Sequence, residues 1–300
     1  MTRLHSRATV ADTALGPNAV DPFAPSETRF CIGPHAGEEM VLDEQRSAYL
    51  LSPHENQPYA ERYGIQEDET VFANFRHDGH WYVVRLSEGA VEKTILQISH
   101  FPMPGPFQIA GHLQIRFKLE VGKEAILVPQ LKGDVDETGQ PLQSGTLTDL
   151  VYSAEAVGAR GDETYSLVKG LQKRFVLAHR MVSIPDRQKT MTDALGNPRW
   201  VEQAEIRTPR VYAQALLRNC VLAGKRDGLS RMYHTIGASC ATEVFARLDE
   251  TLAYGRFQEL RRHVSETCIP VRGFSYLRAR GILGDILQDL NDEFPGPRPP

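Results

Sequence analysis

The chain has 300 residues with a formal net charge of −4, and 41% of them are hydrophobic and 24% charged. This composition is typical of a globular protein, and the charge gives no broad positive field, so we expect no nucleic-acid partner. No stretch approaches the roughly 20 apolar residues of a bilayer-spanning helix, which predicts no integral membrane segment. The N-terminus lacks the apolar run of a secretory signal. The default expectation is a cytoplasmic location, with signal-independent export left open.

The cysteines and histidines do not follow a metal-binding pattern. The four cysteines, at positions 31, 220, 240 and 268, form no C-x-x-C pair and have no histidine at zinc-finger spacing. His77 and His80 flank a turn and could join His54 and His100 in a metal site, but their spacing across a hairpin does not put both rings on one face. The glycines of GARGDETYS do not have phosphate-loop or dinucleotide spacing. We therefore expect no disulfide framework, no metal and no cofactor.

The first third of the chain has the pattern of a disordered arm followed by strands. Residues 1–29 are rich in Pro and Ala and lack periodicity, and the tail 291–300 is similar, which predicts disorder at both ends. TVFANFR and WYVVRLS read as two strands joined by a hairpin turn at Asp78 and Gly79. We expect residues 30–98 to form a β-rich extension of a catalytic domain that covers residues 99–290.

The middle of the chain predicts a central sheet. GHLQIRFKL (111–119) alternates apolar and polar residues, which indicates a half-buried strand. LTDLVYSAEAV (147–157) and KRFVLAHRMVS (173–183) supply two more strands. Together these segments predict a mixed or antiparallel sheet.

From residue 197 onward the pattern changes to helical. Thr208 and Pro209 are typical of a helix start, and Gly224 of its end. A second helix is expected from Ser239, and two more over residues 256–266 and 275–291. A strand-rich middle followed by a helix-rich end predicts an α+β fold, a central sheet with packed helices.

Cys240 has the most suggestive surroundings of any cysteine in the chain. Ser239 is a good N-cap residue, so Cys240 falls at the first helical position, where free N–H groups and the helix dipole stabilise a thiolate. We therefore expect its pKa to lie below that of a free cysteine. Val244, Leu248 and Leu252 follow at intervals of four, which places Cys240 on the buried face of the helix. The alternative is a cysteine that only fills space under the helix start.

A cysteine nucleophile needs a base, and His112 is the best candidate because it opens a predicted strand that can face the helix. Ser153 and Glu155 lie two apart on another strand and so share a face, from which Glu155 could accept a hydrogen bond from the imidazole. Tyr233 and His234 precede the cysteine and could line the pocket, with His234 as the second candidate base. The alternative for each is an ordinary core or surface side chain.

Four segments, in this order and spacing, resemble the bacterial domain-of-unknown-function family 4105 (DUF family 4105): AGHLQIRF, LVYSAEAVGARGDETYSLVKGLQKRF, AEIRTPRVYAQALL and RMYHTIGASCATEVFARLD. That family is similar to the permuted NlpC-like branch of the papain-like fold and includes lipoprotein N-acyltransferases. The resemblance covers roughly residues 98–285. It implies that His112 matches the family's strand histidine and Cys240 its nucleophile. Ser239 stands where the family commonly has Asn, so a substrate-orienting amide is not expected there.

The sequence hypothesis is therefore a cysteine-dependent acyl transfer or hydrolysis of an amide, ester or thioester, through an acyl intermediate on Cys240. His112 would be the base and Glu155 its partner, while the residues expected around substrate or oxyanion are Ser239, Tyr233, His234 and Ser153. The acyl donor would be a lipid, a peptide or a thioester. Two alternatives keep the fold without the chemistry: a binding or adaptor module, and a protein that binds an acyl chain.

Overall fold

The computed structural model describes residues 21, 23–26, 28–42, 45–52, 63–101, 111–131, 134–136, 138–191, 199–252 and 269–295. The helix expected over residues 256–266 lies outside this part, as do His54 and Cys268. Within the described part, no helix is both long enough and apolar enough to cross a membrane.

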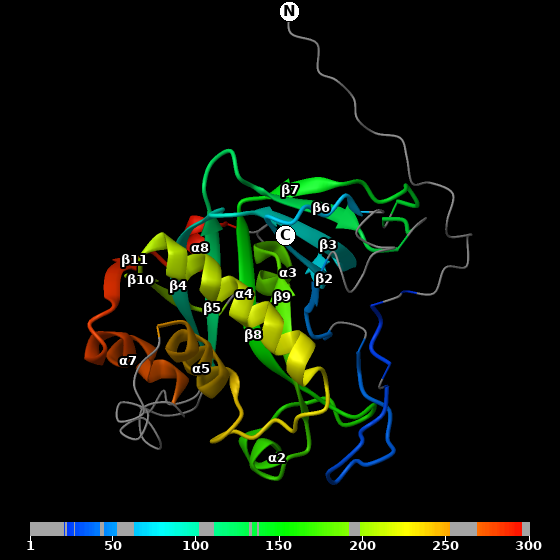
Figure 1. Ribbon diagram of the computed structural model, residues 1–300. Coiled ribbons are helices and arrows are strands. Elements are labelled where there is room, and N and C mark those ends of the chain that lie inside the picture. The colour runs from blue at the N-terminus through cyan, green and yellow to red at the C-terminus, as the bar shows by residue number, and fades with distance from the viewer. Residues whose placement is uncertain are drawn as a thin grey trace, which may run out of the picture.

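The described residues form one 11-stranded sheet in the order β11-β10-β4-β5-β8-β9-β2-β3-β6-β7, with β1 also paired to β2 (Figure 1). The strands are β1 (Tyr49–Leu51), β2 (Glu69–His77), β3 (His80–Ser87), β4 (Val91–His100), β5 (Gly111–Leu119), β6 (Ala125–Pro129), β7 (Gly145–Leu147), β8 (Asp149–Val157), β9 (Val176–Val182), β10 (Val201–Ile206) and β11 (Leu283–Leu287). Neighbouring strands are antiparallel except for β2 and β9, which are parallel. The sheet is therefore mixed.

Helices cover both faces of this sheet. They are α2 (Leu167–Leu171), α3 (Ile184–Thr190), α4 (Arg210–Asp227), α5 (Cys240–Leu252), α7 (Gly273–Ala279) and α8 (Leu290–Glu293), with a 3₁₀ turn at Pro270–Arg272. The main core lies between one face and α4, α5 and α7, and includes Tyr152 of β8. Its neighbour Val151 points to the other face, where it packs with residues of α3 and α8. Figure 1 shows α4 and α5 in front of the sheet and α3 behind it.

The first strands belong to the same sheet as the later ones. Asp78 and Gly79 have φ of 46° and 81°, the left-handed conformations of a tight hairpin turn, which confirms the turn predicted between β2 and β3. The expected boundary between residues 98 and 99 falls inside β4. Phe23, from the expected disordered arm, is buried in a cluster with residues of β1, β2 and β3.

β5 is buried on both faces, so the prediction of a half-buried strand is wrong. Its apolar residues face α4 and α5, as the alternation indicates. Its polar residues Gln114 and Arg116 are 0% and 1% exposed, because the opposite face is also covered. Gln114 donates a hydrogen bond to Gln97 of β4, and Arg116 donates one to Asp149 of β8, which lowers the cost of burying them.

The C-terminal third contains strands where the pattern predicts helices. β10 forms from residues expected to begin the helical region, and β11 replaces the second half of the helix expected over residues 275–291. Gly281, with φ of 69°, ends the helical part, and the chain then pairs with β10. Strand pairing with a distant partner overrides the local helical pattern.

Gly224 does not end its helix. α4 continues to Asp227, and Gly228, with φ of 55°, is the residue at the end. Gly224 instead marks a close approach, because a Cβ there would lie 2.3 Å from the carbonyl oxygen of Ala48. The glycine is needed for packing of the helix against the chain that enters β1.

Candidate functional site

A cavity lies where β5 and β8 stop pairing. The two strands are paired from Lys118 and Asp149 as far as Gln114 and Ser153. Beyond this point β5 continues beside β4, and β8 continues beside β9. A cavity of about 330 Å³ is lined by the ends of both strands and by the start of α5. Because α5 packs against β5 and β8, its first residue reaches the place where the strands separate.

Five of the seven site residues expected from the sequence line this cavity: His112, Glu155, Tyr233, Ser239 and Cys240. Ser153 lies behind it and donates a hydrogen bond to Glu155. The other lining residues are mostly apolar, namely Phe101, Gly111, Ala154, Ala156, Tyr165, Leu167, Ile269 and Pro270, with Gln45, Glu163 and Thr235 as the polar ones. The thiol, imidazole and carboxylate thus line the same largely apolar cavity.

Cys240 is the first residue of α5, as the pattern predicts. Ser239 and Thr242 cap the helix reciprocally: the Ser239 N–H donates to Thr242 Oγ1 at 2.7 Å, and the Thr242 N–H donates to Ser239 Oγ at 3.4 Å. Cys240 is 4% exposed and shares its face with the buried Val244 and Leu248. Capping therefore places the thiol at the wall of the cavity.

The thiol of Cys240 is protonated at neutral pH. Burial raises its pKa to about 11, although N–H groups of Leu113 and Ala241 and the hydroxyl of Tyr233 act in the opposite direction. The expectation of a lowered pKa is therefore wrong, because the loss of solvent exceeds the effect of the helix start. Leu113 lies one residue beyond the last pair of β5 with β8, and its N–H points at the sulfur.

His112 is also neutral at pH 7. Its side chain is 10% exposed, and burial lowers its pKa to about 4, an effect that Glu155 opposes and Arg187 reinforces. Nε2 lies 3.4 Å from Oε1 of Glu155. Nε2 nevertheless has no hydrogen-bond partner among the described residues. The neutral ring therefore makes no hydrogen bond to Glu155, but a protonated ring would be close enough to form an ion pair with it.

Glu155 remains ionised. Burial opposes the charge, but His112, Arg187, Arg180 and the hydroxyl of Ser153 outweigh it and hold the pKa of Glu155 well below its usual range. Oε1 accepts hydrogen bonds from Ser153 Oγ at 2.6 Å and from Arg187 Nη1 at 2.8 Å. The carboxylate can therefore stabilise a positive charge on the imidazole when one forms.

Tyr233 fixes the wall of the cavity beside the thiol. Its backbone N–H donates to the carbonyl oxygen of Phe175 at 2.9 Å, and its ring meets that of Tyr165 edge-on at 5.8 Å. Burial raises the pKa of Tyr233 well above its usual value, so the phenol stays protonated beside Cys240. It can thus donate a hydrogen bond to sulfur or to a bound substrate.

His234 lies elsewhere. Its Nδ1 accepts a hydrogen bond from the N–H of Gly237 at 3.1 Å within a tight turn. The residue lines a different cavity, with Lys173 and Met232. The structure therefore does not bring the second candidate base to Cys240, because the turn that positions the nucleophile directs His234 away from it.

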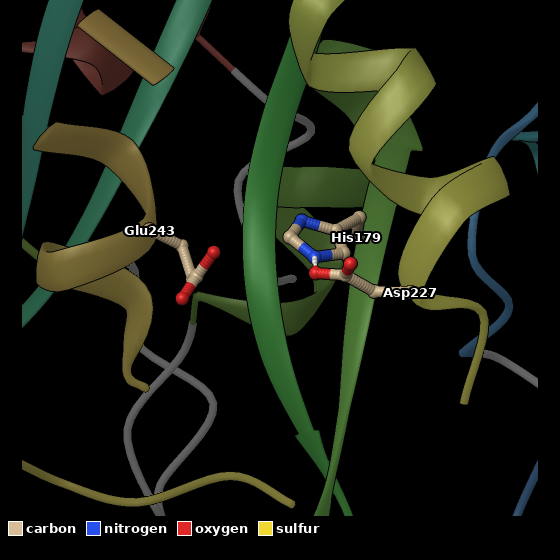
Figure 2. Close-up of side chains that lie close together, drawn as sticks. All are labelled: His179, Asp227 and Glu243. Atoms are coloured by element: carbon tan, nitrogen blue, oxygen red, sulfur yellow. Dashed lines mark hydrogen bonds and ion pairs between the residues drawn. The ribbon is translucent and has the colours of Figure 1, made fainter. Parts of the chain in front are cut away.

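One group in the described part of the chain has a metal-like donor set: His179 of β9, Asp227 of α4 and Glu243 of α5, whose donor atoms lie within 4.8 Å of one another. Figure 2 shows His179 and Asp227 facing each other, joined at 3.1 Å, with Glu243 approaching from α5. Arg231 bridges the two carboxylates, at 3.3 Å from Asp227 and 2.9 Å from Glu243. The guanidinium already supplies the compensating charge, so we interpret the group as an ion-pair network that ties α4 to the first turn of α5.

Sequence reasoning missed Arg187 and the backbone N–H of Leu113. Arg187 lies on α3, whose start is marked by Ser183 as N-cap and a proline at its beginning. These signals predict the helix but not its packing over Glu155. The Leu113 N–H points at the thiol because β5 stops pairing with β8 at the neighbouring Gln114. Nothing in the sequence indicates where that pairing stops.

Comparison of the chain with known protein families, with curated proteins and with solved structures finds no match.

Proposed function

We propose that this protein is a cysteine-dependent enzyme that transfers or hydrolyses an acyl group through an acyl intermediate on Cys240. The observation that carries the proposal is the convergence of a thiol, an imidazole and a carboxylate, from α5, β5 and β8, in one cavity. The acyl bond attacked is an amide, ester or thioester. A helix-borne cysteine and a strand-borne histidine that line one cavity are also found in the papain-like fold, which supports the permuted NlpC-like identity as part of the proposal.

Both reacting side chains start neutral, which sets the order of proton transfer. As Cys240 Sγ forms its bond to the acyl carbon, His112 takes the thiol proton and becomes an imidazolium, which the ionised Glu155 stabilises. The imidazolium then returns that proton to the leaving group as its bond to the acyl carbon breaks. Water or another acceptor attacks the thioester, loses its proton to His112, and the thiol is restored when that proton moves back to sulfur.

Donors that surround the sulfur can stabilise the oxyanion of each step. The N–H groups of Ala241 and Leu113 and the hydroxyl of Tyr233 are the groups that oppose the raised pKa of Cys240, so each of them lies close to the sulfur. An acyl oxygen bound beside sulfur comes within reach of the same donors. Ser239 contributes through its cap, which holds the first turn of α5 in place.

The walls of the cavity favour an apolar acyl group. Phe101, Tyr165, Leu167 and Ile269 offer no charge, and Glu163 is the only carboxylate besides Glu155 that lines the cavity among the described residues. Burial of hydrocarbon against such walls contributes roughly 25 cal/mol for each Å² removed from water. A lipid acyl group or a hydrophobic acyl thioester therefore fits the lining better than a polar peptide.

A second function has support from the same observations. A protonated, buried thiol in an apolar cavity is also what a protein that only binds acyl chains would have. In that case Cys240 fills space, and a Cys240→Ser variant binds acyl ligands as well as the wild type does. A non-catalytic adaptor function makes the same prediction for Cys240.

Mass spectrometry of the intact protein after exposure to p-nitrophenyl esters of increasing chain length separates these functions. We expect one acyl group per chain, mapped to Cys240, with a faster reaction for butanoate and longer chains than for acetate. Cys240→Ser should abolish the adduct. Cys31→Ser is the matched control, because Cys31 is exposed and outside the cavity. With Cys31 replaced by Ser in both proteins, acylation that is as fast in Cys240→Ser as in the chain that keeps Cys240 contradicts the proposal. So does the absence of an adduct on Cys240 with any ester.

A further inference from the structure

A row of buried amides crosses the sheet beside the candidate site. Gln114 of β5, Gln97 of β4 and Gln203 of β10 are direct neighbours in the strand register and are each 0% exposed. Gln114 Nε2 donates to Gln97 Oε1 at 2.6 Å, and Gln97 Nε2 donates to Gln203 Oε1 at 2.6 Å. We call these three residues the glutamine ladder. Its hydrogen bonds all run in one direction.

An arginine closes each end of the glutamine ladder. At one end, Arg187 Nε donates to Gln114 Oε1 and Arg187 Nη1 donates to Glu155 Oε1. At the other end, Arg116 Nη1 donates to Gln203 Oε1 at 3.1 Å, and Arg116 makes a two-pronged ion pair with Glu293 at 2.6 and 2.7 Å. The side chains of Arg187 and Arg116 are 5% and 1% exposed. Each end therefore has a buried arginine that bonds both to a glutamine oxygen and to a carboxylate, and the arginine bound to Glu155 is at the end beside the cavity.

The direction of the ladder fixes the guanidinium of Arg187. Because Gln114 uses its amide N–H to reach Gln97, its oxygen is left to accept from Arg187 Nε. With Nε held, Nη1 faces Glu155 Oε1, which also accepts from Ser153. That oxygen is the one 3.4 Å from His112 Nε2. Arg187 and Ser153 therefore occupy the acceptor that the imidazole would otherwise use.

We propose that Arg187 is a positioning residue: held by the glutamine ladder, it occupies Oε1 of Glu155 and keeps the imidazole of His112 neutral and able to take the Cys240 proton down to acidic pH. This inference rests on the proposed function, in which His112 is the base. A base must be unprotonated to accept a proton, and an imidazole hydrogen-bonded to a free carboxylate would be charged over more of the acidic range.

The other charged groups around His112 act in known directions. Burial is the main cause of its lowered pKa, Glu155 raises it, and three guanidiniums lower it, from Arg187 on α3, Arg199 before β10 and Arg180 on β9. Cys240, the titratable group that α5 contributes to the cavity, is uncharged at the pH values considered. Removal of Arg187 deletes a positive charge and takes away one of the two donors to Oε1, so that this oxygen can accept from His112 Nε2 in its place. Both changes make the imidazole easier to protonate.

The test is an NMR titration of the His112 ring in the full chain. In the wild type we expect a midpoint near pH 4, and in Arg187→Met a midpoint at least one pH unit higher. Arg187→Lys keeps the charge and should shift the midpoint less. Arg116→Met is the matched control, because it breaks an equally buried arginine at the far end of the same ladder and should leave the His112 midpoint in place.

The reaction gives a second readout, the rate of Cys240 acylation as a function of pH. The pH at which this rate falls on acidification should be higher in Arg187→Met than in the wild type, by the same amount as the midpoint of the His112 titration. A residue that only supports the fold would lower the amplitude of activity without moving that fall. If Arg187→Met does not fold, Ser153→Ala, which removes the other donor to Oε1, should shift the midpoint in the same direction by a smaller amount.

An unmoved His112 midpoint in a folded Arg187→Met, or an equal shift in Arg116→Met, overturns the inference. Failure of the proposed function is seen separately, as the absence of any acyl adduct on Cys240 in the wild type. The titration needs no substrate, so the two failures do not resemble each other.

Discussion

Nε2 of His112 lies 3.4 Å from Oε1 of Glu155, yet the two groups make no hydrogen bond in the described structure. The oxygen is already occupied by Ser153 and Arg187. The site therefore holds a neutral imidazole beside an ionised carboxylate. The negative charge that stabilises the imidazolium is in place before His112 takes up a proton. Electrostatic stabilisation arranged in advance of the reaction is the kind that lowers a barrier most effectively.

This arrangement predicts how stability depends on pH. His112 has a pKa of about 4 in the folded chain and 6.5 when free, so between these values the unfolded chain binds a proton that the folded chain does not. Stability should fall as pH decreases through this range, by on the order of 3 kcal/mol from this group. Glu155, whose pKa is lowered, acts in the same direction at lower pH.

Urea unfolding at pH 7, 5.5 and 4.5 measures this dependence. At pH 7 the free energy of unfolding of His112→Asn should be no greater than that of the wild type. Between pH 7 and 4.5 it should decrease less than that of the wild type. A variant that loses as much stability as the wild type over this range would show that His112 is not the group responsible.

The thiols should react with iodoacetamide in the order Cys31, Cys240, Cys220 at pH 7. Cys31 is exposed, whereas burial raises the pKa of Cys240 to about 11 and that of Cys220 higher still. Tyr233→Phe should slow the alkylation of Cys240 by about tenfold, because the variant lacks a hydroxyl that stabilises the thiolate. Peptide mapping after timed alkylation measures each rate. Labelling of Cys240 faster than Cys31 would mean that the resting thiol is ionised, which contradicts the neutral thiol that burial predicts.

Gly224→Ala should destabilise the protein although alanine is the better helix former. In an open helical position the change would stabilise by about 1 kcal/mol. Here the new Cβ would lie 2.3 Å from the Ala48 carbonyl oxygen, so we expect a net loss of about 1 to 3 kcal/mol. Arg218→Ala, at an exposed position of α4, is the control and should change stability by less than about 0.5 kcal/mol. Thermal unfolding that shows a more stable Gly224→Ala would refute the close approach.

Features set by a few neighbouring residues could be predicted from the sequence. The turn at Asp78 and Gly79 and the start of α5 after Ser239 depend on local backbone preference and capping, which act within three or four residues. β11 could not be predicted, because it forms by pairing with β10, about 80 residues away in the chain. The local pattern of the β11 residues favours a helix, and only the pairing with β10 makes them a strand.

The site shows the same division. The sequence hypothesis assigned His112, Glu155 and Cys240 to one site, and the structure places all three around one cavity. The protonation of the thiol could not be predicted, since it depends on how completely the sheet and α5 exclude water. The burial of the polar face of β5 could not be predicted either, because Gln114 and Arg116 form their hydrogen bonds with residues of other strands and helices.

Arg231 should matter more to stability than its exposure suggests. It is the nearest counter-charge to the buried Glu243, at 2.9 Å. Arg231→Ala leaves that carboxylate with Arg247, at 3.8 Å, as its remaining counter-charge among the described residues, and should cost about 2 kcal/mol or more. Arg226→Ala is the control, because Arg226 is half exposed and pairs mainly with Asp227, and it should cost less than about 1 kcal/mol. Equal costs in urea unfolding would show that the network around Glu243 is not held by Arg231.

The acylation time course of Cys240, followed by mass spectrometry at pH 7 with a p-nitrophenyl ester, tests the central claim most directly. Wild type and His112→Asn are compared, with unfolding curves to show that both are folded. Loss of a positioned base should slow acylation by about 10²-fold or more. Equal rates in the two proteins would contradict the role of His112 as the base, because the thiol would then react without the imidazole beside it.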